Sequence, residues 1–209
     1  MCGICGIYHP SQPIDAQLLR ALNSTLTHRG PDGEGYHIEG NTGSERSRRV
    51  GLAMRRLAII DLNTGDQPIY NEDRSVALVF NGEIYNYKEL RHLLQERGHT
   101  LRTQGDTETI VHLYEELGPA CVEKLNGIFA FALWDERTAT LLLARDHLGI
   151  KPMHYASLAD GTLLFGSEIQ SLLRDPRLSR DLDPIAIEQY FAMRYIPSPR
   201  AIYQAIRKL

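Results

Sequence analysis

The sequence lacks long apolar runs and is poor in cysteine. No apolar run approaches the roughly 20 residues of a membrane-spanning helix, and the first residues lack the charged and hydrophobic regions of a signal peptide. Only three cysteines occur in 209 residues, which excludes a disulfide framework and is typical of a reducing compartment. The sequence therefore predicts a cytoplasmic protein with no membrane partner.

Blocks of like charge are also missing. The chain has 23 basic and 26 acidic residues and a formal net charge of -3. Only segment 44–49 is locally basic, which is typical of a solvated loop. No nucleic-acid partner is therefore expected. Apolar residues make up 43% of the chain, enough for the core of one large domain or two small ones.

Motifs for metals and nucleotides do not occur. Cys2 and Cys5 form a C-x-x-C, but no second such pair and no closely spaced histidine pair completes a zinc site. A redox motif of this kind follows a strand and opens a helix, whereas this one stands at the head of an apolar run. The eight histidines show no H-E-x-x-H, and no Gly-x-x-x-x-Gly-Lys loop is present. No metal and no cofactor are expected in this chain.

What the sequence does contain is a succession of short β-type runs and amphipathic stretches. Strands are predicted at 2–9, 35–38, 50–61, 76–80, 100–103, 127–135, 140–145, 153–158 and 162–165, and helices at 14–27, 86–97, 107–117 and up to residue 173. The helices come in batches rather than after each strand. This pattern favours an α+β fold with antiparallel sheets covered by helices. After residue 175 the composition becomes loop-like, which predicts a connector.

Cys2 is the residue on which a site can be built. If Met1 is removed, a thiol and a free α-amine lie on the same residue. A free α-amine has a reference pKa of about 8, which suits a general base at neutral pH. A nucleophile that carries its own base is a known arrangement for acyl transfer. The competing interpretation is that Cys2 is an apolar residue at the start of a buried strand.

Three further positions put polar groups beside apolar segments. Asn81 and Gly82 follow a wholly apolar run, where they suit a site better than a core, although an ordinary turn is the alternative. Arg55 and Arg56 are adjacent on a predicted strand, so one of them should face inward. Asp106 precedes a helix, where an N-cap is the simplest role.

Seven strings in one order carry a family resemblance: 1–4, 28–32, 56–61, 81–86, 106–108, 127–132 and 144–152. Together they resemble the class-II glutamine amidotransferase domain of glutamine-hydrolysing asparagine synthetases. The resemblance implies the N-terminal nucleophile hydrolase fold, a four-layer αββα sandwich of two mainly antiparallel sheets. It also implies a glutaminase domain over residues 2–175, followed in 176–209 by a truncated linker toward an absent ATP-dependent synthetase domain.

The resemblance also implies a reaction and its residues. Cys2 attacks the side-chain amide of L-glutamine, which gives a glutamyl thioester and ammonia, and water then releases glutamate. The Asn81 side chain and the Gly82 N–H stabilise the oxyanion. The rest of the implied pocket binds the substrate: Arg56 for the α-carboxylate, Asp106 for the α-ammonium, and Leu57, Ala58, Ile59, Ile60 and Glu83 along its walls. Arg29 and Asp32 are expected to shape the loop near the nucleophile, and Arg55 to point to solvent.

The partners follow from what is missing. The family's Ser-Gly-Gly-x-Asp-Ser nucleotide loop does not occur here, so ATP and Mg are expected only for the missing synthetase domain, where the ammonia would amidate aspartate. The final nitrogen acceptor, the removal of Met1, a homodimer, and whether the chain is a natural short protein or a fragment stay open. Two alternatives remain: a catalytically silent module that senses glutamine or docks a partner, and the glutaminase domain of a related amidotransferase with another acceptor.

Overall fold

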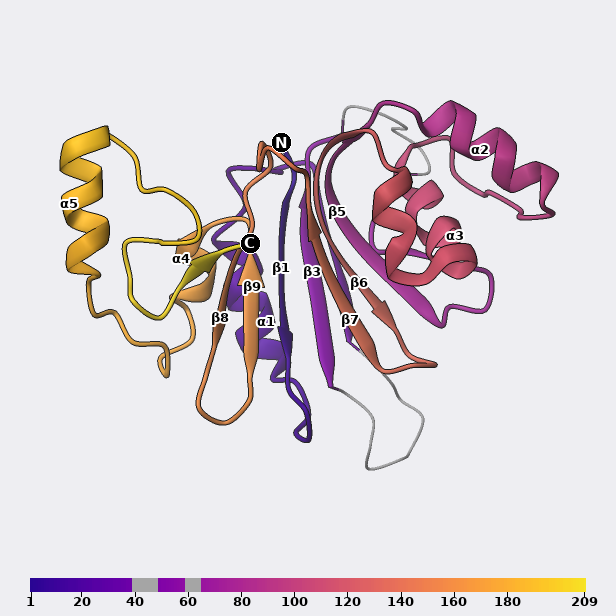
Figure 1. Cartoon of the computed structure of the whole chain (residues 1–209). Coiled ribbons are helices and arrows are strands. Elements are labelled where there is room, and N and C mark those ends of the chain that lie inside the picture. Colours follow the sequence, from indigo (N-terminus) through magenta and orange to yellow (C-terminus); the bar gives the residue numbers. More distant parts are fainter. Residues whose placement is uncertain (39–48, 59–64) are drawn as a thin grey trace.

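The computed structural model describes residues 1–38, 49–58 and 65–209, which form two antiparallel sheets between layers of helices (Figure 1). The strands are β1 (Gly3–Tyr8), β2 (Gly33–Ile38), β3 (Val50–Arg56), β4 (Ile69–Tyr70), β5 (Val76–Ile84), β6 (Gly127–Asp135), β7 (Thr140–Arg145), β8 (His154–Ser157), β9 (Leu163–Gly166) and β10 (Arg207–Lys208). The helices are α1 (Ala16–Ser24), α2 (Tyr87–Glu96), α3 (Thr107–Leu117), the 3-10 helix η1 (Gly118–Lys124), α4 (Ile169–Leu172) and α5 (Pro184–Met193).

One sheet has six strands in the order β10-β8-β9-β1-β3-β2, and the other has four in the order β4-β5-β6-β7. Helices α2 and α3 cover the outer face of the four-stranded sheet, and α1 and α4 pack on the six-stranded sheet (Figure 1). The α+β class and the four-layer αββα arrangement are therefore confirmed.

Alternation along the strands divides the apolar residues among three cores. On β1, Ile4 lies between the two sheets, whereas Ile7 packs in the cluster under α1. On β5, Val79 lies between the sheets, and Leu78 and Phe80 face α2 and α3. Each strand with this period-2 pattern thus supplies one row of side chains to the space between the sheets.

Helix α1 follows the pattern that predicted it. The Asp15 carboxylate accepts hydrogen bonds from the N–H groups of Gln17 and Leu18 at 2.8 and 3.2 Å, which caps the helix. Leu19 and Leu22 are fully buried against the six-stranded sheet. The apolar face and the satisfied N-cap explain why these residues form a helix on this sheet.

Three predicted strands differ from the structure. Residues 100–103 do not form a strand, because the N–H groups of Arg102 and Thr103 donate to the Glu108 carboxylate at 2.8 and 2.7 Å instead of to a neighbouring strand. Strand β5 does not end before Asn81 but continues to Ile84, which rules out a turn there. The predicted strand 50–61 ends at Arg56 within the described part, and residues 59–61 lie outside it.

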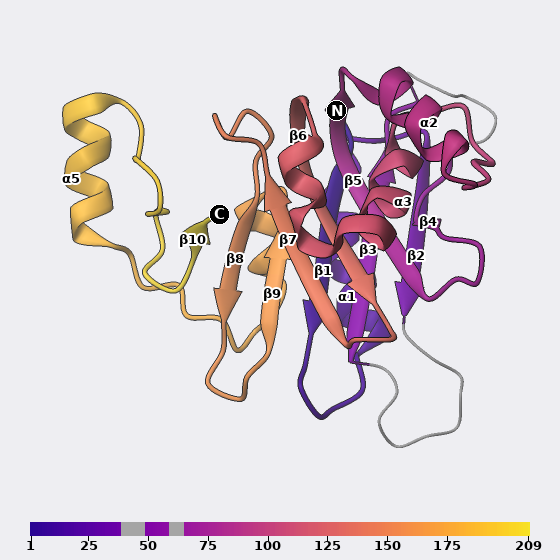
Figure 2. The same ribbon diagram turned by 45° about the vertical axis from the view of Figure 1, so that its right-hand side comes forward.

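The segment 176–209 has more structure than the predicted connector. It contains α5, capped by Asp183, and β10, which pairs with β8. Leu178 and Ile206 from this segment are buried in the core under α1. Figure 2 agrees with Figure 1 in placing α5 away from both sheets, and its Phe191 is 77% exposed. Within the part of the chain that the structure describes, no helix has the length and apolar character to cross a membrane.

Candidate active site

Three of the rows between the sheets end in polar side chains. Cys2 continues the row of Ile4 on β1 and packs against the core between the sheets. Arg56 and Asn81 come two residues after core members of β3 and β5, so strand alternation points their side chains into the same layer. The three meet at one end of the sandwich, around a pocket of about 140 Å³.

The pocket brings together most of the residues that the sequence predicted. Its lining includes Cys2, Arg56, Leu57, Asn81, Gly82, Glu83 and Asp106. Ala58 is not part of this lining; its N–H donates to the Asp32 carboxylate at 2.9 Å. Ile59 and Ile60 lie outside the described residues.

Cys2 is the accessible thiol of this protein. Its Sγ lies 3.4 Å from the backbone N–H of Leu57, which donates to it, and the residue is half-buried. Cys5 and Cys121 are fully buried, and burial raises the pKa of their thiols to about 12 and about 11. Cys5 packs under α1, on the other side of the sheet from Cys2. The C-x-x-C therefore forms neither a disulfide nor a shared metal site.

Arg29 and Asp32 hold the backbone around the thiol. Arg29 donates from Nε to the carbonyl of Cys2 at 3.0 Å and from Nη1 to Glu168 at 2.9 Å. Asp32 fixes Ala58, the residue after Leu57. These contacts agree with the prediction that both residues shape the surroundings of Cys2.

The edge of β5 beside the pocket has side-chain acceptors on either side of Gly82. The Phe80 N–H donates to the Gln67 side chain at 2.7 Å, and the Ile84 N–H donates to the Asp106 carboxylate at 2.8 Å. Gly82 lies midway between them, and alternate N–H groups of a strand point to the same edge. The N–H of Gly82 therefore points to this edge, toward the pocket that Gly82 lines.

Asn81 supplies a second donor. The residue is 1% exposed, and its Nδ2 has no hydrogen-bond partner among the described residues. A buried donor without a partner costs about 1–3 kcal/mol, so such a group is uncommon unless a ligand uses it. At Gly82 a Cβ would lie 2.3 Å from the carbonyl oxygen of Ile128, so only glycine fits beside this donor.

Arg56 and Arg55 face opposite sides of β3, as predicted. Arg56 is 9% exposed and pairs with Asp66 at 2.6 Å, through a carboxylate whose side chain is 86% exposed. The Asp66 carboxylate is in solvent, whereas the Arg56 guanidinium belongs to the lining of the pocket. The expectation that Arg55 points to solvent is wrong: its side chain is 18% exposed and pairs with Glu34 at 2.8 Å.

Asp106 stands at the N-cap position of α3 but does not cap it. Its side chain makes no cap hydrogen bond and instead accepts from Ile84, across the edge of β5. Burial raises the pKa of the Asp106 carboxyl, and the nearby Glu83 raises it further. The pocket thus holds a thiol and two donors between a guanidinium and a carboxyl group.

Comparison with known proteins agrees with this geometry. The model of a family described as "Glutamine amidotransferase domain" matches residues 1–209. The chain belongs to this family.

The curated relatives of this amidotransferase domain include two from Bacillus subtilis (strain 168). Asparagine synthetase (glutamine-hydrolyzing) 1 is 37% identical over 100% of this chain and 32% of its own length. Asparagine synthetase (glutamine-hydrolyzing) 2 is 42% identical over 88% of this chain and 24% of its own length. The putative asparagine synthetase (glutamine-hydrolyzing) 2 of Methanocaldococcus jannaschii is 36% identical over 100% of this chain and 42% of its own length. The chain thus spans less than half the length of each of these relatives.

Two solved structures share the fold. The allosteric regulatory enzyme of purine biosynthesis superposes with a TM-score of 0.65 at 22% identity, over 83% of this chain and 43% of that one. Glutamine phosphoribosylpyrophosphate amidotransferase from B. subtilis gives a TM-score of 0.64 at 21% identity, over 82% and 43%.

The pocket residues of the amidotransferase domain that the sequence analysis did not assign to the site include Gln67, Thr103 and Lys151. Lys151 is 9% exposed, and its Nζ lies 3.2 Å from the Sδ of Met1. Lys151 lies within one of the strings that carry the resemblance, which was the only signal for it. No sequence signal pointed to Gln67 or Thr103. They reach the pocket through contacts between segments that are distant in sequence, which local patterns do not encode.

The loop beside Thr103 gives the domain a pH-dependent element. Burial disfavours the charged form of Glu108, but the nearby His112 side chain and hydrogen bonds from the backbone N–H groups of Arg102 and Thr103 outweigh it and lower the pKa of Glu108 to about 2. A lowered native pKa stabilises the fold above the unfolded value of about 4.3, and this stabilisation is lost as the pH falls toward 2.

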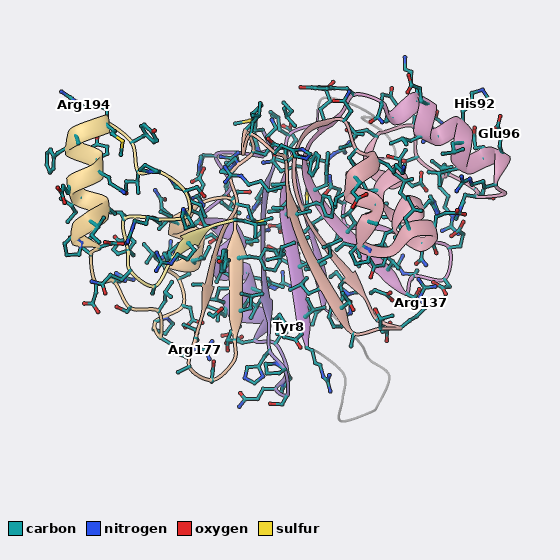
Figure 3. The ribbon with its side chains drawn as sticks, in the orientation of Figure 1. Tyr8, His92, Glu96, Arg137, Arg177 and Arg194 are labelled. Carbon is teal, nitrogen blue, oxygen red and sulfur yellow. The ribbon has the colours of Figure 1, made fainter. Side chains whose placement is uncertain are left out.

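Glu108→Gln is therefore expected to lower the free energy of unfolding at pH 7 by about 1–3 kcal/mol. The variant should also lose less stability than the parent between pH 4.5 and pH 2.5. Urea unfolding at these pH values measures both effects. Glu96→Gln, an exposed position on α2 (Figure 3), is the control and should behave like the parent. Equal acid sensitivity of Glu108→Gln and the parent would contradict the role of Glu108.

Proposed function

We propose that this domain hydrolyses L-glutamine to glutamate and ammonia through a thioester on Cys2. The observation that carries the proposal is the half-buried thiol at a pocket where Asn81 presents a buried amide without a partner among the described residues. The ends of the pocket match a free amino acid. The Arg56 guanidinium suits an α-carboxylate, and the Asp106 carboxylate suits an α-ammonium.

The chemistry follows from these groups. After Met1 is removed, the amine of Cys2 accepts the thiol proton while Sγ attacks the side-chain amide carbon of glutamine. Asn81 Nδ2 and the Gly82 N–H donate to the oxygen that becomes negative. The amine then gives its proton to the leaving nitrogen, and ammonia departs. Water attacks the thioester, which releases glutamate and restores the thiol.

The nitrogen acceptor belongs to the rest of a longer enzyme. The relatives are named as glutamine-hydrolysing asparagine synthetases, and this chain spans 32% of the first of them. We propose that residues 176–209 lead to an ATP-dependent synthetase part that uses the ammonia to amidate aspartate, and that ATP and Mg serve only that part. The exposed Tyr190 and Phe191 of α5 offer it an apolar contact. The cytoplasmic location and the absence of a cofactor in this chain stay predictions.

A second function is favoured by one contact. Met1 lines the pocket, and its sulfur meets Lys151. A chain that kept Met1 would have no free amine on Cys2 and would bind glutamine without turnover, as a sensing module. Mass spectrometry of the intact purified chain distinguishes the two, because the proposed glutaminase requires the mass without Met1.

Arg56→Lys tests the recognition of the α-carboxylate. A lysine keeps the charge but loses the planar pair of donors, a difference worth about 1.5–3 kcal/mol at a charge-assisted contact. We expect KM for glutamine to rise about 10- to 100-fold, with a much smaller change in kcat, in steady-state assays of glutamate release. Arg55→Lys, on the other face of the strand, is the matched control and should keep the parent KM. An unchanged KM in Arg56→Lys would show that Arg56 does not bind the α-carboxylate of glutamine.

A further inference from the structure

A cluster of histidines and glutamates lies outside the pocket, on the helical side of the four-stranded sheet. Glu72 comes from the turn between β4 and β5, His99 follows α2, and His112 and Glu115 lie on α3. None of the four lines the pocket. We propose that these four residues bind a divalent transition-metal ion of the zinc type.

The spacing of the four side chains fits such an ion. Nδ1 of His112 lies 2.9 Å from Oε2 of Glu115 and 3.8 Å from Oε2 of Glu72, and Nδ1 of His99 lies 3.8 Å from the same Glu115 oxygen. In a tetrahedral zinc site with bonds of about 2.0–2.2 Å, neighbouring ligand atoms are about 3.3 Å apart. Ligand atoms of Glu72, His99 and His112 all lie within 4.8 Å of one another, so side-chain movements would bring these three residues and Glu115 to the spacing of a tetrahedral site.

The outer contacts of both histidines also match a metal site. Nε2 of His99 lies 3.1 Å from Glu116, and Nε2 of His112 faces Glu108 at 3.8 Å. With the ion on both Nδ1 atoms, both Nε2 atoms carry hydrogen and point to a carboxylate. Metal-bound histidines in proteins are oriented in this way. His112 is 1% exposed, and within the described chain its Nε2 has no hydrogen-bond partner.

The alternative is a cluster without a metal, in which a protonated His112 pairs with the carboxylates. It explains less of this arrangement. Burial opposes charge on His112, but the neighbouring carboxylates of Glu108 and Glu115 raise its pKa, and a proton on Nδ1 accounts for the contact with Glu115 at 2.9 Å. A proton on His112 assigns no role to Nδ1 of His99, which lies 3.8 Å from the same Glu115 oxygen in a ring 4.9 Å from that of His112. A metal ion takes both rings as neutral ligands, and Glu72 and Glu115 balance its charge.

The donor set indicates the class of ion. Two imidazoles with two carboxylates suit zinc and neighbouring transition metals, whereas magnesium and calcium prefer oxygen ligands throughout. The site also has an entry path, because the Glu72 side chain is 43% exposed while His112 lies beneath it. A bound ion would link α3 to the β4–β5 turn and to the segment after α2. Helix α3 begins directly after Asp106, which lines the pocket. Its expected effect is on stability, and it does not depend on the proposed hydrolysis.

Zinc titration of the whole chain tests the site. The parent for this experiment carries Cys2→Ala, so that the accessible thiol cannot bind the metal. Isothermal titration with zinc chloride is expected to show one equivalent bound, and thermal unfolding with zinc is expected to show a raised midpoint. His99→Gln and Glu72→Gln, both at partly exposed positions, should weaken binding more than about 10-fold, and Glu116→Gln should weaken it about 10- to 100-fold.

His92→Gln, an exposed histidine on α2 (Figure 3), is the matched control and should bind zinc like the parent. Circular dichroism shows whether each variant is folded. The proposal is overturned if the folded parent binds no zinc, or if folded His99→Gln and Glu72→Gln bind it as tightly as the parent. Equal weakening by His92→Gln would also overturn it, because binding would then lie on surface histidines.

Discussion

Cys2→Ala is expected to reduce glutamine hydrolysis by on the order of 10⁴-fold or more while the protein stays folded. The substitution removes the only atom proposed to form the thioester. It leaves the amine, the oxyanion donors and the two charged ends of the pocket in place. Cys2 is half-buried, and its sulfur makes only weak contacts with Leu57, at 3.4 Å from the nitrogen and 3.7 Å from the oxygen. Its loss should therefore have little effect on the free energy of unfolding.

The comparison that makes this test specific is Cys121→Ala. Cys121 is fully buried in the core under α2 and α3. Its replacement should lower stability by roughly 1 kcal/mol and leave turnover by the folded protein unchanged. Glutamate release, circular dichroism and intact mass are measured on both variants and the parent, with Met1 removed in each. Undiminished turnover by Cys2→Ala would end the thioester mechanism.

Strand alternation made much of this site predictable. Alternation predicted that one of Arg55 and Arg56 faces inward, and it places Asn81 on the inner face once β5 is seen to continue to Ile84. The same rule separates Arg55 from Arg56. It also explains why Cys2 and Cys5 cannot act together, since they lie on opposite sides of a sheet. The ends of the strands were less predictable, since β5 continues beyond the predicted residue 80 to Ile84 and β3 ends at Arg56.

The features that the sequence did not predict depend on contacts between segments that are distant in the chain. The Asp106 carboxylate accepts from Ile84 rather than capping α3, and Gln67 occupies the edge of β5 at Phe80. Strand β4 pairs only with residues 77 and 78 of β5. Beyond them, the Gln67 and Asp106 side chains accept the hydrogen bonds that a longer β4 would have accepted. The length of β4 is a matter of register, which local propensity does not fix. The same holds for 176–209, where a loop-like composition conceals a helix and a strand that pairs with β8.

The open edge of β5 and the unpaired amide beside it lead to the second large prediction. Asn81→Ala is expected to lower kcat about 10²- to 10³-fold, because one oxyanion donor contributes about 2.7–4 kcal/mol to the barrier, and to change KM little. Its effect on stability should be small or favourable. Nδ2 of Asn81 has no partner in the described protein, so its removal breaks no hydrogen bond and relieves a buried donor.

Asn71→Ala is the matched control, since Asn71 is equally buried at the other end of the same sheet. Its Nδ2 donates to Ser75 at 3.1 Å and to Glu115 at 2.8 Å, and its Oδ1 accepts from Val76 at 3.0 Å. We expect Asn71→Ala to lose about 1–3 kcal/mol of stability and to keep kcat, the reverse of Asn81→Ala. Urea unfolding and steady-state kinetics on both variants separate the two effects. If Asn81→Ala instead lost stability and kept kcat, Asn81 would be a structural residue, and the oxyanion would need another donor.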